Sequence, residues 1–296
     1  MSVIDLHMHS IASSDGEMTP SQLIERAQKV GMKIIALSDH NMVKNVEETI
    51  ELGKQVGIKV IPACEFSTVM LDGTELHVLG YNIDIHDKRL LEREKKIREQ
   101  LLGFGDMFIN KALDYGFQFE KEEVYAKAND GIVTEEMIGE TIFADHRNDD
   151  MEELLPYRKG GEYSDNPGFN FFRNYYAQGK PLNCQLGDYN MPIKDVEEII
   201  HGTGGVMVLA HPNHNIAHNL EKLEKIMEYG LDGIEVFSSY HKQQDTDFYY
   251  QQAKQRGLIM TVGSDFHGKT KPAIEMGSVD CDEEEVLKGL RKFSLV

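Results

Sequence analysis

Apolar residues in the first 85 and the last 95 positions alternate between short β-rich runs and longer runs with helical spacing. Alternating strands and helices predict a parallel sheet, either closed into a barrel or doubly wound with helices on both faces. The chain therefore belongs to the α/β class. Seven Val-, Ile- and Leu-rich runs predict the strands, near 3–7, 33–37, 58–63, 75–81, 206–210, 232–237 and 258–262.

Local start and stop signals support the helices between these strands. Thr19 can cap a helix, Pro20 occupies its first position, and Gly31 follows its last apolar position. Comparable patterns predict further helices near 43–56, 218–229, 244–256 and 282–293.

The segment 87–180 does not follow the strand–helix rhythm. Its charged run from 87 to 100 predicts a solvated helical face, and 156–168 contains the prolines and glycines of an irregular loop. We therefore predict a core domain formed by 1–86 and 181–296, with 87–180 inserted as a mostly helical cap.

Composition places the chain among ordinary globular proteins, with 41% apolar and 27% charged residues over 296 positions. No apolar run approaches the roughly 20 residues that span a bilayer, and no secretory signal is visible. Cys64, Cys184 and Cys281 are odd in number and widely spaced, which favours reduced thiols. We expect a cytoplasmic protein that does not bind membranes.

A formal net charge of −19 disfavours long nucleic acids as partners, because binding them normally requires a basic surface. A small phosphorylated metabolite remains compatible, since bound divalent metals would reverse the local charge. The charge therefore limits the size of the substrate, and the oligomeric state stays open.

Histidines and carboxylates recur at the ends of the predicted strands. His7 and His9 lie two residues apart at a strand end, so their side chains point to the same side and can chelate one ion. Such a pair alone is equally compatible with a structural role. Comparable residues follow or lie in the other strands, and Asp15 lies in a Ser-Asp-Gly turn; the additional candidates are Asp15, His40, Glu65, His77, His211, Asp265 and His267.

These nine candidates suggest more than one metal ion. In a βα barrel the carboxyl ends of the strands meet on one face, where residues remote in sequence form active sites. Imidazole and carboxylate ligands without thiolate suit Zn, Mn or Fe. Nine ligands exceed the needs of one ion, so we predict two or three divalent ions, an arrangement used for hydrolysis at phosphorus.

The order of these motifs resembles that of the PHP (polymerase and histidinol phosphatase) family of metal-dependent phosphoesterases. The resemblance covers about 1–85 and 203–270 and implies the family's distorted (β/α)7 barrel, here with an inserted mainly helical cap. The segments that carry it are Asp5-Leu6-His7-Met8-His9-Ser10, Ser14-Asp15-Gly16, Leu37-Ser38-Asp39-His40, Glu65, His77, Ala210-His211-Pro212 and Gly263-Ser264-Asp265-Phe266-His267.

The resemblance also implies a ligand assignment and a reaction. The expected reaction is hydrolysis of a small phosphate ester of a sugar or nucleotide, a phosphomonoester or a cyclic phosphodiester, by a metal-bridged hydroxide that releases inorganic phosphate. Glu65 and Asp265 are then catalytic candidates as well as ligands. The first metal would be held by His7, His9, Glu65 and Asp265, the second by Glu65, His77 and His211, and the third by Asp15, His40 and His267.

Other residues are candidates for substrate contacts. His241, after the sixth predicted strand, could protonate the leaving group or contact phosphate, or it could be a surface histidine that opens a helix. Arg158 and Lys159 precede two glycines, a pattern typical of a phosphate-binding segment or of an exposed turn. Arg173 and Lys180 are further candidates of this kind.

The chain departs from the nucleotide-phosphatase branch of the family in one respect. That branch carries an Arg-Pro-His segment in its insertion, whereas this chain has 134–140, Thr-Glu-Glu-Met-Ile-Gly-Glu, near that place. The departure disfavours plain nucleoside monophosphates. Two alternatives stay open: a short-oligonucleotide exonuclease, and a catalytically silent, metal-stabilised binding module.

Overall fold

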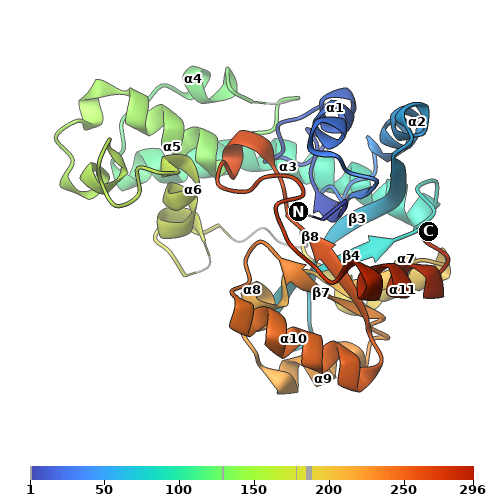
Figure 1. Cartoon of the computed structure of the whole chain (residues 1–296). Coiled ribbons are helices and arrows are strands. Elements are labelled where there is room, and N and C mark those ends of the chain that lie inside the picture. Colours follow the sequence, from blue (N-terminus) through green and yellow to red (C-terminus); the bar gives the residue numbers. More distant parts are fainter. Residues whose placement is uncertain (1, 129, 178, 185–188) are drawn as a thin grey trace. The chain divides into compact units, whose positions relative to one another are not determined.

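The computed structural model describes residues 2–128, 130–177, 179–184 and 189–296, which form two compact units (Figure 1). The first unit contains Met1–Glu94, Asp188–Gly268 and Ala273–Val296, and the second contains Lys95–Gly187 and Lys269–Pro272. Each unit has a hydrophobic core of its own. Among the described residues, every helix is too short or too polar to span a bilayer.

The first unit is built on a sheet that nearly closes into a seven-stranded barrel, as predicted. The first and last strands meet through a bridge between Met8 and Phe266, and the Asp265 N–H donates to the His7 carbonyl oxygen at 2.8 Å. A two-residue strand, β5 (Met191–Pro192), pairs with β3. The barrel strands, in spatial order, are β1 (Ile4–Met8), β2 (Ile34–Leu37), β3 (Lys59–Val69), β4 (Glu75–Tyr81), β6 (Val206–Leu209), β7 (Gly233–Ser238) and β8 (Ile259–Gly263).

The prediction of a wholly parallel sheet was wrong for β4, which runs antiparallel to both β3 and β6. The cause is a tight hairpin after β3, in which Gly73 adopts φ +81° and the Met70 N–H donates to the Thr74 carbonyl oxygen. The reversal places His77 opposite Ser67, toward the carboxyl end of β3. A histidine near the start of β4 therefore reaches the rim where the parallel strands end.

Helices pack outside the barrel strands of this unit, and their local signals explain their ends. Thr19 and Gln22 form a capping box at the start of α1, and Gly31 ends it with φ +83°. We predicted no helix over 193–202, although its apolar residues have helical spacing. The helices of this unit are α1 (Pro20–Val30), α2 (Val46–Val56), α7 (Ile193–Gly202), α8 (Pro212–Ile216), α9 (Leu220–Met227), α10 (Gln243–Arg256) and α11 (Glu283–Lys292).

The second unit is helical among its described residues and has an aromatic core. The rings of Phe171 and Tyr175 stack with centroids 4.6 Å apart, and Phe117 meets both edge-on. The helix α3 (Lys88–Tyr115) begins in the first unit and continues into the second. The remaining helical segments are α4 (Lys121–Tyr125), α5 (Glu135–Ala144), η1 (His146–Asn148), η2 (Glu152–Tyr157), α6 (Pro167–Phe171), η3 (Phe172–Tyr176) and η4 (Gly268–Thr270).

The strands β1, β6, β7 and β8 are buried along their whole length. This is the usual condition of barrel strands, which have packed side chains on both faces. Three of the buried positions nevertheless carry ionisable side chains: Asp5 and His7 in β1, and Glu235 in β7. Ionisable groups are costly to bury without partners, so these positions direct attention to the barrel rim.

Candidate metal centre

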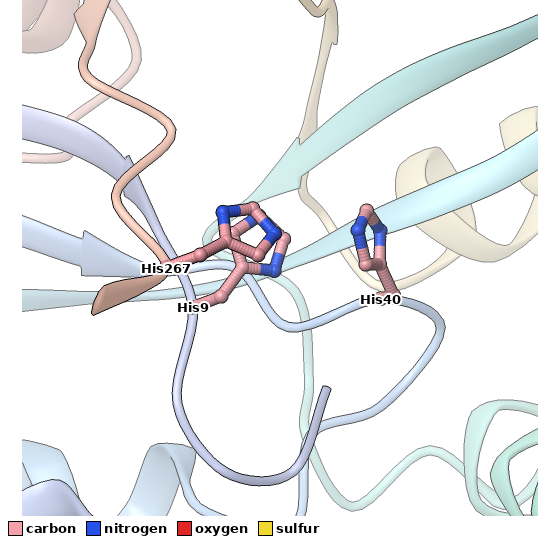
Figure 2. A group of neighbouring side chains, drawn as sticks. All are labelled: His9, His40 and His267. Carbon is pink, nitrogen blue, oxygen red and sulfur yellow. The ribbon is translucent and has the colours of Figure 1, made fainter. Parts of the chain in front are cut away.

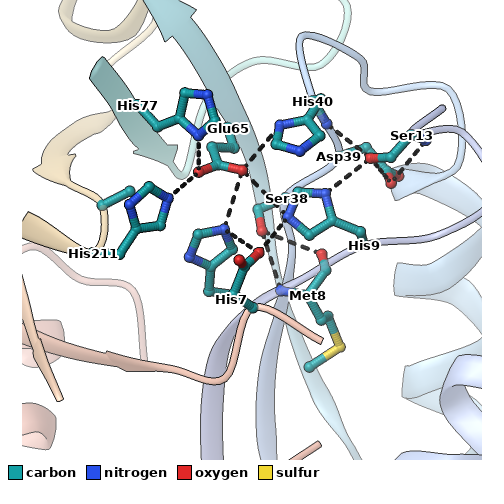
Figure 3. A network of polar contacts seen from close by, with 12 residues as sticks. His7, Met8, His9, Ser13, Ser38, Asp39, His40, Glu65, His77 and His211 are labelled. Atoms are coloured by element: carbon teal, nitrogen blue, oxygen red, sulfur yellow. Dashed lines mark hydrogen bonds and ion pairs between the residues drawn. The ribbon is translucent and has the colours of Figure 1, made fainter. Parts of the chain in front are cut away.

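The carboxylate of Glu65 lies at the centre of a ring of histidines (Figure 3). It points from within β3, which continues to Val69, so Glu65 does not follow the strand as we had predicted. Its side chain is fully buried. One oxygen, Oε1, lies 2.9 Å from His77 Nδ1 and 3.0 Å from His211 Nε2. One carboxylate thereby joins β4 and the end of β6.

The other oxygen of Glu65 faces three further imidazoles. Its Oε2 lies 3.0 Å from His40 Nδ1, 3.2 Å from His7 Nε2 and 3.3 Å from His9 Nε2. Asp265 Oδ1 approaches the same two nitrogens, at 3.3 Å from His7 and 3.1 Å from His9. Asp265 holds this position with φ +58°, a backbone conformation that non-glycine residues seldom adopt.

Three groups of possible metal ligands occur among the described residues. His7, His9, Glu65 and Asp265 form the first and are all buried. His40, Glu65 and His77 form the second. His9, His40 and His267 form the third (Figure 2), in which the rings of His9 and His267 stack with centroids 3.9 Å apart.

The polar atoms in these groups are better placed to bind metal ions than to form hydrogen bonds with one another. Within the described part of the chain, His7 Nε2, His9 Nε2, His40 Nδ1 and Glu65 Oε2 are buried and have no hydrogen-bonding partner. They lie close together with poor hydrogen-bond geometry, and buried polar atoms of this kind require an explanation. A divalent cation would satisfy them, because the carboxylate oxygen offers a lone pair and each imidazole nitrogen offers one once its proton is displaced.

The electrostatics of the metal-free protein agree with this view. Burial opposes a charge on His9, but the carboxylates of Asp265 and Glu65 outweigh it and raise the pKa of His9 to about 9. His7 is also desolvated, yet Glu65, Glu235 and Asp265 raise its pKa well above the ordinary value. Burial raises the pKa of Glu65, but the surrounding histidines outweigh it and hold that pKa well below the ordinary value. Cationic partners thus stabilise the carboxylate in the absence of metal.

Buried side chains behind the ligands hold the loops that present them. Asp39 precedes His40 in the chain, and its carboxylate accepts hydrogen bonds from the backbone and hydroxyl groups of Ser10 and Ser13. The Ser13 hydroxyl also lies 2.9 Å from His9 Nδ1 and accepts the His40 N–H. Asp39 therefore supports two ligands through Ser13.

A model of one protein family, the PHP domain, matches residues 5–160, which is more than half of the 296 residues. A curated relative from Chromobacterium violaceum, a 3′,5′-nucleoside bisphosphate phosphatase, is 30% identical over 289 residues and covers 95% of this chain and 92% of its own. The chain belongs to the PHP family of metal-dependent phosphoesterases.

Two other curated relatives are named for activities on different phosphate esters. A 5′-3′ exoribonuclease from Haemophilus influenzae is 28% identical over 269 residues, with 89% of both chains covered. A phosphoribosyl 1,2-cyclic phosphate 1,2-diphosphodiesterase from Eggerthella lenta is 24% identical over 266 residues, covering 90% of this chain and 94% of its own.

A solved structure confirms the PHP fold. The structure of an amidohydrolase from Chromobacterium violaceum with bound sulfate and no metal matches with a TM-score of 0.76 at 24% identity. The match covers 99% of this chain and 97% of the other. The nearly closed seven-stranded barrel with helical insertions is therefore shared by both proteins.

The first of the three ligand groups has the composition that the resemblance implied for the first metal. For the second, His211 meets Glu65 as expected, but His40 lies in the same group. For the third, Asp15 Oδ2 lies 3.1 Å from His267 Nε2 and 3.8 Å from His40 Nε2. The assignment of each residue to a particular ion stays a prediction.

The candidate substrate residues lie in other surroundings. His241 Nδ1 lies 2.8 Å from the Val236 carbonyl oxygen, its Nε2 faces the Asn213 N–H at 3.4 Å, and burial lowers its pKa. Both ring nitrogens thus meet backbone groups. Its proposed role in proton transfer or phosphate binding stays a prediction.

The four cationic candidates all belong to the second unit. Arg158 donates to the Phe143 carbonyl oxygen and pairs with Asp149 at 2.9 Å, so its guanidinium has internal partners. Lys159 and Lys180 are exposed, and the guanidinium of Arg173 lies over the Phe169 ring at 5.9 Å. Their contacts with substrate stay a prediction.

Sequence reasoning did not single out Glu235 or Tyr240, two residues that contact ligands directly. Tyr240 donates a hydrogen bond to Asp265 Oδ2, and Glu235 Oε1 lies 2.9 Å from His7 Nδ1. A glutamate in the otherwise apolar run Gly233-Ile234-Glu235-Val236-Phe237 was the one available signal. A buried strand rarely contains an acidic residue without a reason.

Gly16 allows the turn that presents Asp15, and Gly16→Ala is expected to disrupt it. A Cβ atom at this position would lie 1.8 Å from the Ser10 carbonyl oxygen, in a loop already fixed by Asp39. We expect a loss of about 1–3 kcal/mol in the free energy of unfolding, the usual cost of overpacking, and a lower metal content. Denaturant titration and elemental analysis measure both quantities.

The matched control is Gly103→Ala in α3, where a Cβ would meet no atom within 4 Å. Because alanine favours helix, this change should increase stability by up to about 1 kcal/mol. A Gly16→Ala protein with unchanged stability and full metal content would contradict the prediction.

Proposed function

We propose that this PHP protein hydrolyses small phosphate esters of nucleotides or sugars and releases inorganic phosphate, with two or three divalent ions in its ligand groups. The observation that carries the proposal is the sharing of Glu65 between the first group and His40, His77 and His211. A carboxylate with both oxygens engaged in this way suits adjacent metal ions. Closely spaced ions, when bound, would supply a nucleophile at neutral pH and neutralise charge on phosphate.

The buried and the accessible ligands would have different roles in this proposal. His7, His9 and Asp265 would hold the most buried ion, since their side chains are at most 3% exposed. Asp15 and His77, with side chains 23% and 34% exposed, are the most accessible ligands. We infer that the substrate phosphate approaches over these two residues, while the buried group stays shielded from water.

The class of substrate is inferred from relatives and from charge. A nucleoside bisphosphate, a ribosyl cyclic phosphate and RNA share a phosphate ester attached to ribose, and the three relatives named above act on these compounds. The net charge of −19 disfavours long chains of the same chemistry. We therefore propose a ribose-based phosphate ester of low molecular weight.

A substrate panel tests this proposal. The metal-loaded protein would be assayed for phosphate release from a nucleoside 3′,5′-bisphosphate, a nucleoside 5′-monophosphate, a ribose 1,2-cyclic phosphate and oligoribonucleotides of increasing length. Chelator-treated protein and the Glu65→Gln variant control for contaminating phosphatases. Turnover of a small ester that disappears in both controls is the expected result.

Two other results would favour other functions. A rate that increases with oligonucleotide length would favour the exoribonuclease alternative, which the Haemophilus influenzae relative supports. No turnover of any compound by fully loaded protein would contradict the hydrolytic proposal. A silent binding module additionally predicts that His7→Ala lowers the melting temperature while no activity is lost.

A further inference from the structure

Glu235 is a fully buried carboxylate near the middle of β7. A buried carboxylate is strongly unfavourable unless hydrogen bonds or opposite charges compensate it. Its partners therefore indicate its role.

Both oxygens of Glu235 contact histidine residues of the metal centre. Oε1 lies 2.9 Å from His7 Nδ1, and Oε2 accepts the backbone N–H of His211 at 2.7 Å. His7 Nε2 faces one oxygen of Glu65, and His211 Nε2 faces the other. Glu235 thus contacts one histidine on each side of Glu65.

The contact with His7 fixes the orientation of its ring. Nδ1 faces a carboxylate oxygen and Nε2 is directed at Glu65 and Asp265, so Nδ1 would keep its proton when an ion displaces the proton on Nε2. A histidine that binds metal through one nitrogen commonly donates the other N–H to a carboxylate, which also increases the basicity of the ligand. Glu235 occupies the position of that carboxylate.

The contact with His211 holds an unfavourable backbone conformation. His211 has φ +23° and ψ +63°, outside the main regions that non-glycine residues adopt, and it precedes Pro212. Such conformations persist where surrounding contacts fix them. The hydrogen bond from the His211 N–H to Glu235 is one such contact, and it directs the imidazole toward Glu65.

Gly263 in β8 leaves the space that this arrangement needs. A Cβ atom there would lie 2.1 Å from Glu235 Oε1 and 2.3 Å from His7 Cβ. Since φ at Gly263 is not among the positive values, the need for glycine is one of space. Residues of three strands, β1, β7 and β8, therefore make or accommodate the contact between Glu235 and His7.

We propose that Glu235 is a positioning residue that fixes the ring of His7 and the backbone of His211 together. It thereby couples the two sides of the centre that Glu65 joins. Loss of Glu235 should therefore weaken the binding of more than one ion. The inference rests on the metal-binding part of the proposed function. Glu235 itself does not have to touch metal or substrate.

The test compares Glu235→Gln with Asp232→Asn. Glutamine keeps the size of the side chain but offers one acceptor oxygen for two N–H donors. Asp232, just before β7, is a close match: Oδ2 accepts the Met207 N–H at 2.9 Å and lies 2.9 Å from His201 Nε2. Like Glu235, it joins a histidine side chain to a backbone amide, but neither of its partners belongs to a ligand group.

Binding of Mn²⁺ would be measured by isothermal titration after chelation, with the number of retained ions determined by elemental analysis. We expect Glu235→Gln to weaken the affinity by about 10–100-fold and to lower the occupancy of more than one ion. Asp232→Asn should bind Mn²⁺ within about twofold of the unaltered protein. Equal affinity of Glu235→Gln and the unaltered protein would overturn the proposal, as would loss of a single ion.

A second measurement needs no variant, and it tests the contact with His7 even if Glu235→Gln does not fold. In Zn²⁺-loaded protein labelled with ¹⁵N-histidine, the His7 ring should carry its proton on Nδ1 and bind metal through Nε2. Metal on Nδ1 would overturn the assignment to Glu235. An unaltered protein that binds neither ion would contradict the proposed function instead, so the two failures are distinguishable.

Discussion

Glu65→Gln is expected to lower the rate of phosphate release by at least about 10³-fold, equivalent to about 4 kcal/mol in the barrier. Five imidazole nitrogens of the described residues lie within 3.3 Å of its two carboxylate oxygens. An amide lacks the negative charge and offers one oxygen, so the carboxylate can no longer be shared between ions. Steady-state assays on the best substrate of the panel, with metal analysis of the same samples, measure the effect.

The same substitution elsewhere in the hairpin provides the control. Glu75 lies at the exposed start of β4, paired with Val69 of β3 and remote in register from Glu65. Glu75→Gln should keep the activity and metal content of the unaltered protein. Glu65→Gln activity within tenfold of the unaltered level would show that the carboxylate is not shared as proposed.

Metal affinity is expected to increase with pH between about 7 and 9, by about 10-fold per pH unit for each proton displaced. In the metal-free protein the pKa of His9 is about 9 and that of His7 is raised well above 6.5. Both rings are then protonated at neutral pH, and an ion must displace these protons. Titrations in two buffers of different ionisation enthalpy would count the protons released.

The stability of the metal-free protein should change in the opposite direction. A histidine whose folded pKa exceeds its unfolded value stabilises the fold fully below the unfolded pKa, and this contribution is lost as pH rises through the folded pKa. For His9 the window runs from 6.5 to about 9. The melting temperature should therefore fall over this range with chelator present. With metal in excess, tighter binding should oppose that fall.

A metal affinity that does not change between pH 7 and 9 would contradict this account. It would mean that His7 and His9 are already neutral before the ion binds. Comparison with Asp265→Asn would locate the cause, because Asp265 is one of the carboxylates that raise both pKa values.

The order of strands and the chemistry of the ligands could be predicted from the sequence because both are local properties. A run such as Val206–Leu209 is apolar and β-branched, and Thr19, Pro20 and Gly31 mark the ends of a helix through their own backbone preferences. The identity of a side chain also limits which ions it can bind. The pattern of His and carboxylate at strand ends therefore indicates a metal site by itself.

Tertiary structure alone decided which side chains come together in each ligand group and which residues hold them in place. The antiparallel direction of β4 depends on a hairpin, and it changes the end of the strand from which His77 reaches the rim. The pairing of His7 with Glu235 joins residues 228 positions apart, a separation at which sequence carries no local signal. The carboxylate of Asp39 likewise has its hydrogen-bond donors, Ser10 and Ser13, in a loop that is remote in sequence. The sequence by itself determined the ligand types and the α/β class, and its resemblance to a known family implied the barrel. Burial, strand direction and contacts between remote segments determined how the ligands are arranged.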